Sequence, residues 1–215
     1  MTSLLRLFAT LALAAALPCI AGAGEDGKGE NLLVFVGQRI SLAEQPPSRC
    51  DNCIIMDVHY AATYRILDTV YGNYRGSTID FEVYDHYGVP AFSKYDTVLL
   101  FVSRQPDGSW VHEKYQFYDL YKGVDGEWYG CGDPYGSAPK PPRAIRARPV
   151  EFAAPVSYPL DGISANRIAK AYPAQYFKIR DGRAYCLKGA PVPDLFEAKK
   201  QTVLAARGIF KQENR

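Results

Sequence analysis

The sequence predicts a mainly β protein, folded as an antiparallel barrel or sandwich. Tyrosine gives the first indication: 16 are present and twelve of them fall between Tyr60 and Tyr135, and aromatic enrichment of this kind favours sheet. The second is the alternation of apolar and polar residues over 77–84 and 110–121. The third is a series of short Gly-, Pro- or Asp-containing turns between at least five strand-like segments, with no helical pattern between them.

The chain begins with the features of a secretory signal peptide. Arg6 precedes an apolar run from Leu7 to Ile20, and the small residues Ala21-Gly22-Ala23 follow. A positive start, an apolar core too short to span a bilayer and an A-x-A cleavage pattern are typical of export signals. We therefore expect residues 1–23 to be removed, a mature start near Gly24, and a periplasmic or secreted protein.

The charge balance and the hydropathy exclude several kinds of partner. Without the signal, the chain has 24 Lys and Arg against 23 Asp and Glu, so it has no global field that would attract nucleic acid or an anionic membrane. No later segment has 18 consecutive apolar residues, and we expect no membrane span. The glycines serve turns rather than a phosphate-binding loop, and we expect no cofactor.

The first predicted strands are an apolar run at 32–36 and a long segment at 54–71. In the long segment, the alternation of apolar and polar residues loses its regular phase toward the end, which predicts a bulge or bend near Asp68. Before the break, one face carries Val58, Tyr60, Ala62, Tyr64 and Ile66. The next strand, 77–84, has Ile79, Phe81 and Val83 inward. The remaining predicted strands, two of them introduced by Asp-Gly turns, are 97–102, 110–121 and 127–129.

A proline-rich basic tract, residues 136–149, divides the mature chain. Its composition is typical of a semi-rigid linker or a long surface loop. Its cations could also bind an anionic cell-wall polymer or lipopolysaccharide. These cations are Lys140, Arg143, Arg146 and Arg148. We expect a β-barrel domain at 24–135 and a C-terminal appendage at 150–215.

The appendage is expected to contain a hairpin and a helix, packed on the barrel. Residues 150–158 suit one more strand and 164–171 a short helix that stops before Pro173. A hairpin at 176–187 turns at Asp181-Gly182. Asp194 and Glu197 form a capping box for a helix at 195–207. The apolar stripe of that helix comprises Leu195, Phe196, Val203, Ala206, Ile209 and Phe210.

Two blocks carry a family resemblance. They are Tyr64…Val70-Tyr71-Gly72…Gly76 and Tyr95-Asp96-Thr97-Val98-Leu99-Leu100-Phe101-Val102. Residues 32–130 resemble the OB-type barrel of secreted netrin-like and metalloproteinase-inhibitor-like domains, which implies an OB-like fold and a binding function. Inhibitors of that class chelate the zinc of their target with an N-terminal cysteine, whereas here the first cysteine after the expected start is Cys50. The resemblance therefore implies a binding module without that mode of inhibition.

Four cysteines follow the signal, namely Cys50, Cys53, Cys131 and Cys186. An even number in an oxidising compartment predicts two disulfides. The hairpin register places Cys186 on the face of Phe177 and Ile179, and we favour Cys131–Cys186 with Cys50–Cys53 as a local closure. Pairing of Cys131 into the 50–53 loop is the main competitor. The C-x-x-C spacing also allows a redox or a zinc site, but its proline-rich loop before a strand is not the helix start that redox catalysis uses.

The candidate binding residues are Tyr84, Asp85, His86, Tyr87, Trp110 and Trp128. Exposed aromatic rings on barrel loops stack on sugars or on partner side chains. Asp85 beside His86, with His59 or Glu82 near, also suits general-base chemistry. Residues 112–116, H-E-K-Y-Q, resemble a zinc-protease motif that lacks its second histidine. Their alternating neighbours instead predict a solvated strand face, and we expect no metal site.

We expect an exported, non-catalytic binding or interaction protein, of inhibitor or immunity type, whose partner is another extracytoplasmic protein. A cell-envelope glycan-binding or glycan-processing protein is the alternative. A small hydrolase centred on Asp85 and His86 is the third hypothesis.

Overall fold

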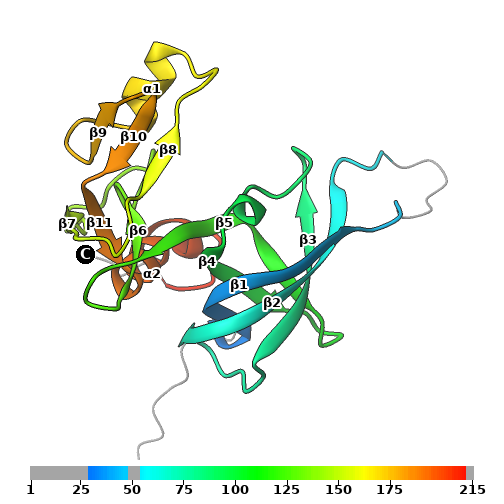
Figure 1. Ribbon diagram of the computed structural model, residues 1–215. Helices are drawn as coiled ribbons and strands as arrows, with labels where there is room; N and C mark the ends of the chain where they lie inside the picture. Colours follow the sequence, from blue (N-terminus) through cyan, green and yellow to red (C-terminus); the bar gives the residue numbers. More distant parts are fainter. Residues whose placement is uncertain (1–28, 48–53, 212–215) are drawn as a thin grey trace, which may run out of the picture.

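The computed structural model describes residues 29–47 and 54–211 and is mainly β, as predicted (Figure 1). The expected signal at 1–23 and the pair Cys50 and Cys53 lie outside the described residues. The long strands are β1 (Leu32–Glu44), β2 (Val58–Tyr71), β3 (Thr78–Asp85), β4 (Thr97–Arg104) and β5 (Trp110–Lys122). The short strands are β6 (Trp128–Cys131), β7 (Arg148–Pro149), β8 (Ser157–Pro159), β9 (Phe177–Arg180), β10 (Arg183–Cys186) and β11 (Lys188–Pro191). The helical segments are η1 (Gly29–Asn31), η2 (Ala91–Lys94), α1 (Ala165–Ala171), α2 (Val192–Lys199) and the π-helical turn η3 (Lys200–Leu204).

The five long strands form a ring in the order β1-β2-β3-β5-β4. Neighbours in the ring are antiparallel except β3 and β5, which run parallel and meet at Glu82 and Val111. η2 follows β3 and places Phe92, which is 2% exposed, against the rings of Tyr64, Phe81 and Phe117. The interior of the ring is therefore packed with aromatic side chains.

β4 and the first half of β1, residues 32–37, are buried on both faces, which explains their continuous apolar runs. Alternate side chains, such as Leu33 and Val98, enter the core of the ring. The others, such as Val34 and Phe101, enter a second core, which Leu195 of α2 and Leu204 of η3 cover. The C-terminal segment therefore packs on the outer face of the ring.

The bulges predicted in β2 are confirmed. The pairing of β1 with β2 shifts register between Val34 and Phe35 and again between Val36 and Gly37, on either side of Asp68. The alternation before the bulges and the inward side chains of β3 are also as predicted. Beyond the bulges, Val70 and Tyr71 pack against the second core instead of the first. The break in phase thus marks the point where β2 passes from one core to the other.

The regular alternation expected for β5 is wrong over residues 113–116. Leu100 pairs with Phe117 but Val102 pairs with His112, so β5 contains a bulge of several residues. His112 and Gln116 are buried rather than solvated. The regular strand expected over 110–121 did not include this bulge.

The C-terminal helix begins earlier than the capping box predicted. α2 begins at Val192, with Pro191 before it and Pro193 in its first turn, a position that proline favours because its missing N–H has no helical partner. Asp194 lies within that first turn and is not the cap. The π-helical turn η3 then changes the spacing of side chains around the helix axis. As a result Leu204, which lies outside the predicted apolar stripe, is completely buried.

β8, β10 and β9 form a small separate sheet, packed with α1 around Phe177 and Ala184 (Figure 1). The hairpin register is as predicted, with Cys186 opposite Phe177. The predicted Cys131–Cys186 disulfide is confirmed, with Cα atoms 6.1 Å apart. Ile179, expected to be buried, is 50% exposed because it lies at the open end of this sheet. The strand expected at 150–158 is reduced to the three residues of β8.

No helix within the described residues is long and apolar enough to cross a membrane.

Candidate functional site

Exposed apolar side chains gather at one end of the ring. Among the described residues, twelve large hydrophobic side chains are exposed, and seven of them belong to the segments 54–56 and 84–89 or to the bulge of β5. We call these seven the apolar rim: Ile54, Ile55, Met56, Tyr84, Tyr87, Val89 and Tyr115. Tyr87 is 84% and Ile54 89% exposed. Exposed apolar surface that is concentrated in this way marks interaction sites in soluble proteins.

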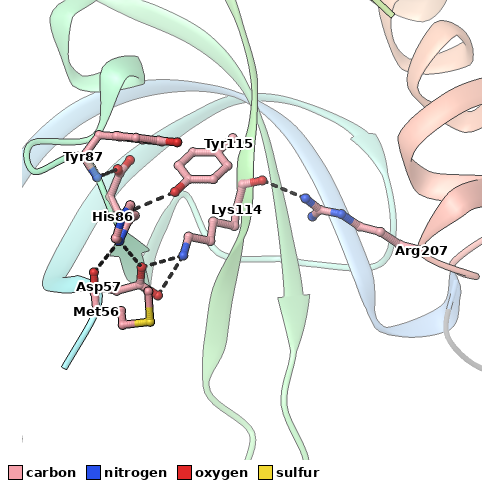
Figure 2. A network of polar contacts seen from close by, with 8 residues as sticks. Met56, Asp57, His86, Tyr87, Lys114, Tyr115 and Arg207 are labelled. Carbon is pink, nitrogen blue, oxygen red and sulfur yellow. Dashed lines mark hydrogen bonds and ion pairs between the residues drawn. The ribbon is translucent and has the colours of Figure 1, made fainter. Parts of the chain in front are cut away.

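Specific contacts bring these segments together (Figure 2). The Nδ1–H of His86 donates to the carbonyl of Met56 (2.6 Å), and the backbone N–H of His86 donates to the Tyr115 hydroxyl (3.4 Å). The rings of Tyr87 and Tyr115 are 5.8 Å apart. His86 therefore links the segment before β2, the end of β3 and the bulge of β5.

An ion pair lies beneath the apolar rim. Lys114 Nζ contacts both carboxylate oxygens of Asp57, at 2.6 and 2.7 Å. Asp57 also lies 3.9 Å from His86 Nδ1. The Asp57 bond is the main cause of the raised pKa of Lys114. Both side chains are about one-third exposed, so we assign the pair a positioning role and little stability of its own.

The bulge of β5 connects the apolar rim to the C-terminal segment. Tyr115 has a φ of 66°, a left-handed conformation that a bulky residue adopts only when its surroundings impose it. Arg207 donates to the carbonyl of Lys114 (2.8 Å), the contact drawn in Figure 2. It also donates to the Glu113 carboxylate (2.5 Å). Ser103 of β4 donates to the other oxygen of Glu113. The bulge is thus fixed from both sides.

A second polar pair lies on the outer face of β2 and β3. His59 and Glu82 are hydrogen-bonded through Nε2 and Oε2. The ring of Tyr84 stacks on His59 with centroids 4.7 Å apart and planes 8° apart. One flat aromatic face is therefore presented beside a carboxylate and an imidazole.

The structure brings four of the six predicted binding residues together. Tyr84, His86 and Tyr87 are exposed at the end of β3, whereas Asp85 is buried and accepts the backbone N–H of Tyr87 (2.8 Å). Because His86 bonds Met56 instead, the side chains of Asp85 and His86 bond different partners. Their adjacency in sequence does not make them a hydrogen-bonded dyad.

The two tryptophans lie elsewhere. Trp110, at the start of β5, packs edge-on against Tyr74 beyond the far end of β2, 6.0 Å away. Trp128 pairs with Lys122 at the other end of β5, and the Lys122 ammonium lies over its ring. Neither side chain belongs to the apolar rim.

Two titratable groups under the bulge have perturbed pKa values. Burial lowers the pKa of His112 to about 4, and its Nε2–H donates to the carbonyl of Gln116 (2.9 Å). Burial also lowers the pKa of Lys199 to about 8, with a smaller contribution from Arg207, while its ammonium donates to the Gln116 side chain (2.9 Å). Both groups support the bulge from inside the molecule and do not reach the apolar rim.

Across residues 29–47 and 54–211, no three His, Cys, Asp or Glu side chains lie close enough together to hold a metal ion.

Sequence reasoning missed the residues that complete the site, Asp57, Lys114 and Tyr115. Asp57 and Lys114 are 57 residues apart, and no local pattern connects them. The run Ile54-Ile55-Met56, three apolar residues after a proline-rich loop, was the one available signal.

Comparison with protein-family models, with curated proteins and with solved structures gave no match.

Proposed function

We propose that this chain is an exported, non-catalytic binding protein that contacts another extracytoplasmic protein through the apolar rim. The gathering of seven exposed apolar side chains at one end of the ring is the observation that carries the proposal. Aromatic residues are enriched at protein interfaces, and isolated exposed hydrophobics elsewhere on a surface need no such explanation. Export rests on the N-terminal sequence and agrees with a disulfide between Cys131 and Cys186.

We also propose that the ring is a barrel of OB type. Its five strands, with a helical turn between β3 and β4, support this assignment. Barrels of this type bind ligands on the face of their second and third strands and on adjoining loops. The apolar rim occupies the ends of β2 and β3 and the connection that leads into β2, which is the corresponding surface.

Paired variants test the protein-binding function. The rim variant carries Ile54→Ser and Tyr87→Ser. The control carries Leu67→Ser and Val124→Ser, two apolar residues that are 42% and 61% exposed and lie outside the rim. Each protein is immobilised and exposed to an envelope extract. We expect the wild type and the control to retain the same protein and the rim variant to lose it. Equal retention by the rim variant, or no retention by the wild type, would contradict the proposal.

An envelope glycan is the second candidate ligand, favoured by the Tyr84 ring stacked on His59. A flat aromatic face flanked by hydrogen-bonding groups is suited to a sugar ring. Binding of purified envelope polysaccharide, measured by titration calorimetry, should then fall with Tyr84→Ala and remain with Tyr74→Ala. Unchanged binding in the Tyr84 variant, or no binding by the wild type, would exclude this candidate.

A further inference from the structure

The total charge of the chain is close to neutral, but its positive and negative residues are concentrated in different parts of the sequence. Residues 24–135 contain 9 Lys and Arg against 17 Asp and Glu, whereas residues 136–215 contain 15 against 6. The ring is therefore acidic and the C-terminal part strongly basic. An asymmetry of this size between two parts of a chain is typical of proteins that bind a polyanionic surface.

The outer face of the small sheet concentrates part of this positive charge. Lys178 and Arg180 of β9 and Arg183 of β10 alternate with the side chains that enter the core around Phe177 and Ala184. They therefore share the face that points away from that core. Arg180 and Arg183 are direct cross-strand partners, an arrangement of like charges that costs stability unless an anion lies nearby.

Among the described residues, no carboxylate forms an ion pair with Lys178, Arg180 or Arg183. Arg183 bonds Ser157 through Nε and Nη2 (2.8 and 3.0 Å), and the Arg180 guanidinium lies 4.3 Å from the centre of the Tyr185 ring. In the described part of the chain, only one cation of residues 136–191, Lys140, forms an ion pair, and its partner is Asp133. Further exposed cations of this region are Arg143, Arg146, Arg148, Arg167 and Lys170.

We propose that this basic face docks on an anionic phospholipid surface. Lys178, Arg180 and Arg183 lie side by side on the outer face of a sheet rather than converging on one point, which suits an extended array of phosphates better than a single one. Leu187, which directly follows β10, is 43% exposed, and an apolar side chain beside cations strengthens contact with the interface of a bilayer. The acidic ring is repelled by the same surface, so the ring faces away from it.

This interface is distinct from the apolar rim. The small sheet lies apart from the ring, whereas the rim is formed at the ends of β2 and β3 (Figure 1). Docking through the basic face therefore leaves the rim accessible, and the two proposals fail or succeed separately.

Co-sedimentation with vesicles tests the proposal. The mature chain is mixed with vesicles of phosphatidylcholine alone or of phosphatidylcholine with phosphatidylglycerol. We expect binding to the anionic vesicles only, and weaker binding as salt is added. Lys178→Gln with Arg180→Gln should lower the partition coefficient about 25-fold, because each cation near an anionic lipid surface contributes about fivefold.

The matched control removes two exposed cations from the ring, through Arg65→Gln and Arg75→Gln, and should bind as the wild type does. Circular dichroism and the thermal midpoint check that each variant is folded. Equal binding to neutral vesicles, an unchanged partition of the Lys178/Arg180 variant, or an equal loss in the control would each overturn the proposal. Displacement by millimolar inorganic phosphate at constant ionic strength would also overturn it, since that result indicates a discrete phosphate site.

Discussion

Arg207 donates a hydrogen bond to the main-chain carbonyl of Lys114 at 2.8 Å, so a residue of the C-terminal segment fixes the strand that carries Tyr115. The same guanidinium contacts the Glu113 carboxylate at 2.5 Å. The conformation of the apolar rim therefore depends on a contact made across more than 90 positions of sequence, from a segment that packs on the outside of the ring.

Replacement of Arg207 by alanine should loosen the bulge of β5. The change removes two hydrogen bonds and leaves Glu113, only 16% exposed, without its cation. We expect the free energy of unfolding to fall by about 1–3 kcal/mol. We also expect faster amide exchange at 113–116 than in the wild type, measured by hydrogen–deuterium exchange. Arg146→Ala, which removes an exposed arginine outside this network, is the control and should change neither. Unaltered exchange at 113–116 in the Arg207 variant would contradict this account of the bulge.

Stability should decrease in mild acid because of His112. Its pKa is lowered in the folded protein from 6.5 to about 4, so between these values the unfolded chain binds a proton that the folded chain does not. The free energy of unfolding therefore decreases as the pH falls through this window, by up to about 3 kcal/mol. Urea unfolding at several pH values should give a steeper dependence for the wild type than for His112→Gln. Equal slopes for the two proteins would show that burial of this imidazole does not matter.

Removal of the Tyr64 hydroxyl should not destabilise the protein. Within the described residues, this hydroxyl is buried without a hydrogen-bond partner, and burial raises the pKa of the phenol. Tyr64→Phe should leave the free energy of unfolding unchanged or raise it by about 1 kcal/mol, because an unsatisfied buried group is lost. Tyr118→Phe is the comparison, since the Tyr118 hydroxyl donates to the carbonyl of Pro134. That variant should be less stable than the wild type. A clear loss of stability on Tyr64→Phe would indicate a partner for the hydroxyl.

The Cys131–Cys186 disulfide should make a large contribution to stability. It closes a loop with a sequence separation of 55, for which the chain-entropy estimate is about 4 kcal/mol. The double variant Cys131→Ser/Cys186→Ser should lose stability of this order in urea unfolding. The small sheet should then exchange its amides faster than the ring. A loss below about 1 kcal/mol would mean that the sheet is held mainly by its core around Phe177.

The features predicted correctly from sequence are those with a local cause. Alternation in β3 identified its inward side chains, and the broken phase near Asp68 located the bulges of β2. A two-residue turn at Asp181-Gly182 fixed the register that places Cys186 opposite Phe177. In each case the pattern and the structure it specifies lie within a few residues of one another.

The features that sequence reasoning missed depend on contacts distant in sequence. The bulge at 113–116 is imposed by contacts with Arg207, Asp57 and Lys199, each of which is distant from it in sequence. Burial of His112 follows from the packing of Phe92 over it. The apolar rim exists only because folding joins the segment before β2 to the end of β3. Each of these features needs the tertiary structure before it can be recognised.

Site-specific photo-crosslinking tests the binding function most directly. A photoreactive phenylalanine analogue is placed at Tyr87, inside the apolar rim, and at Val124, which is 61% exposed outside it. Each protein is expressed with its complete N-terminal sequence in the native envelope and irradiated there. We expect the analogue at Tyr87 to form one defined adduct with another extracytoplasmic protein, and the analogue at Val124 to form none. The same adducts from both positions, or none from Tyr87, would contradict the proposal that the apolar rim is the binding surface.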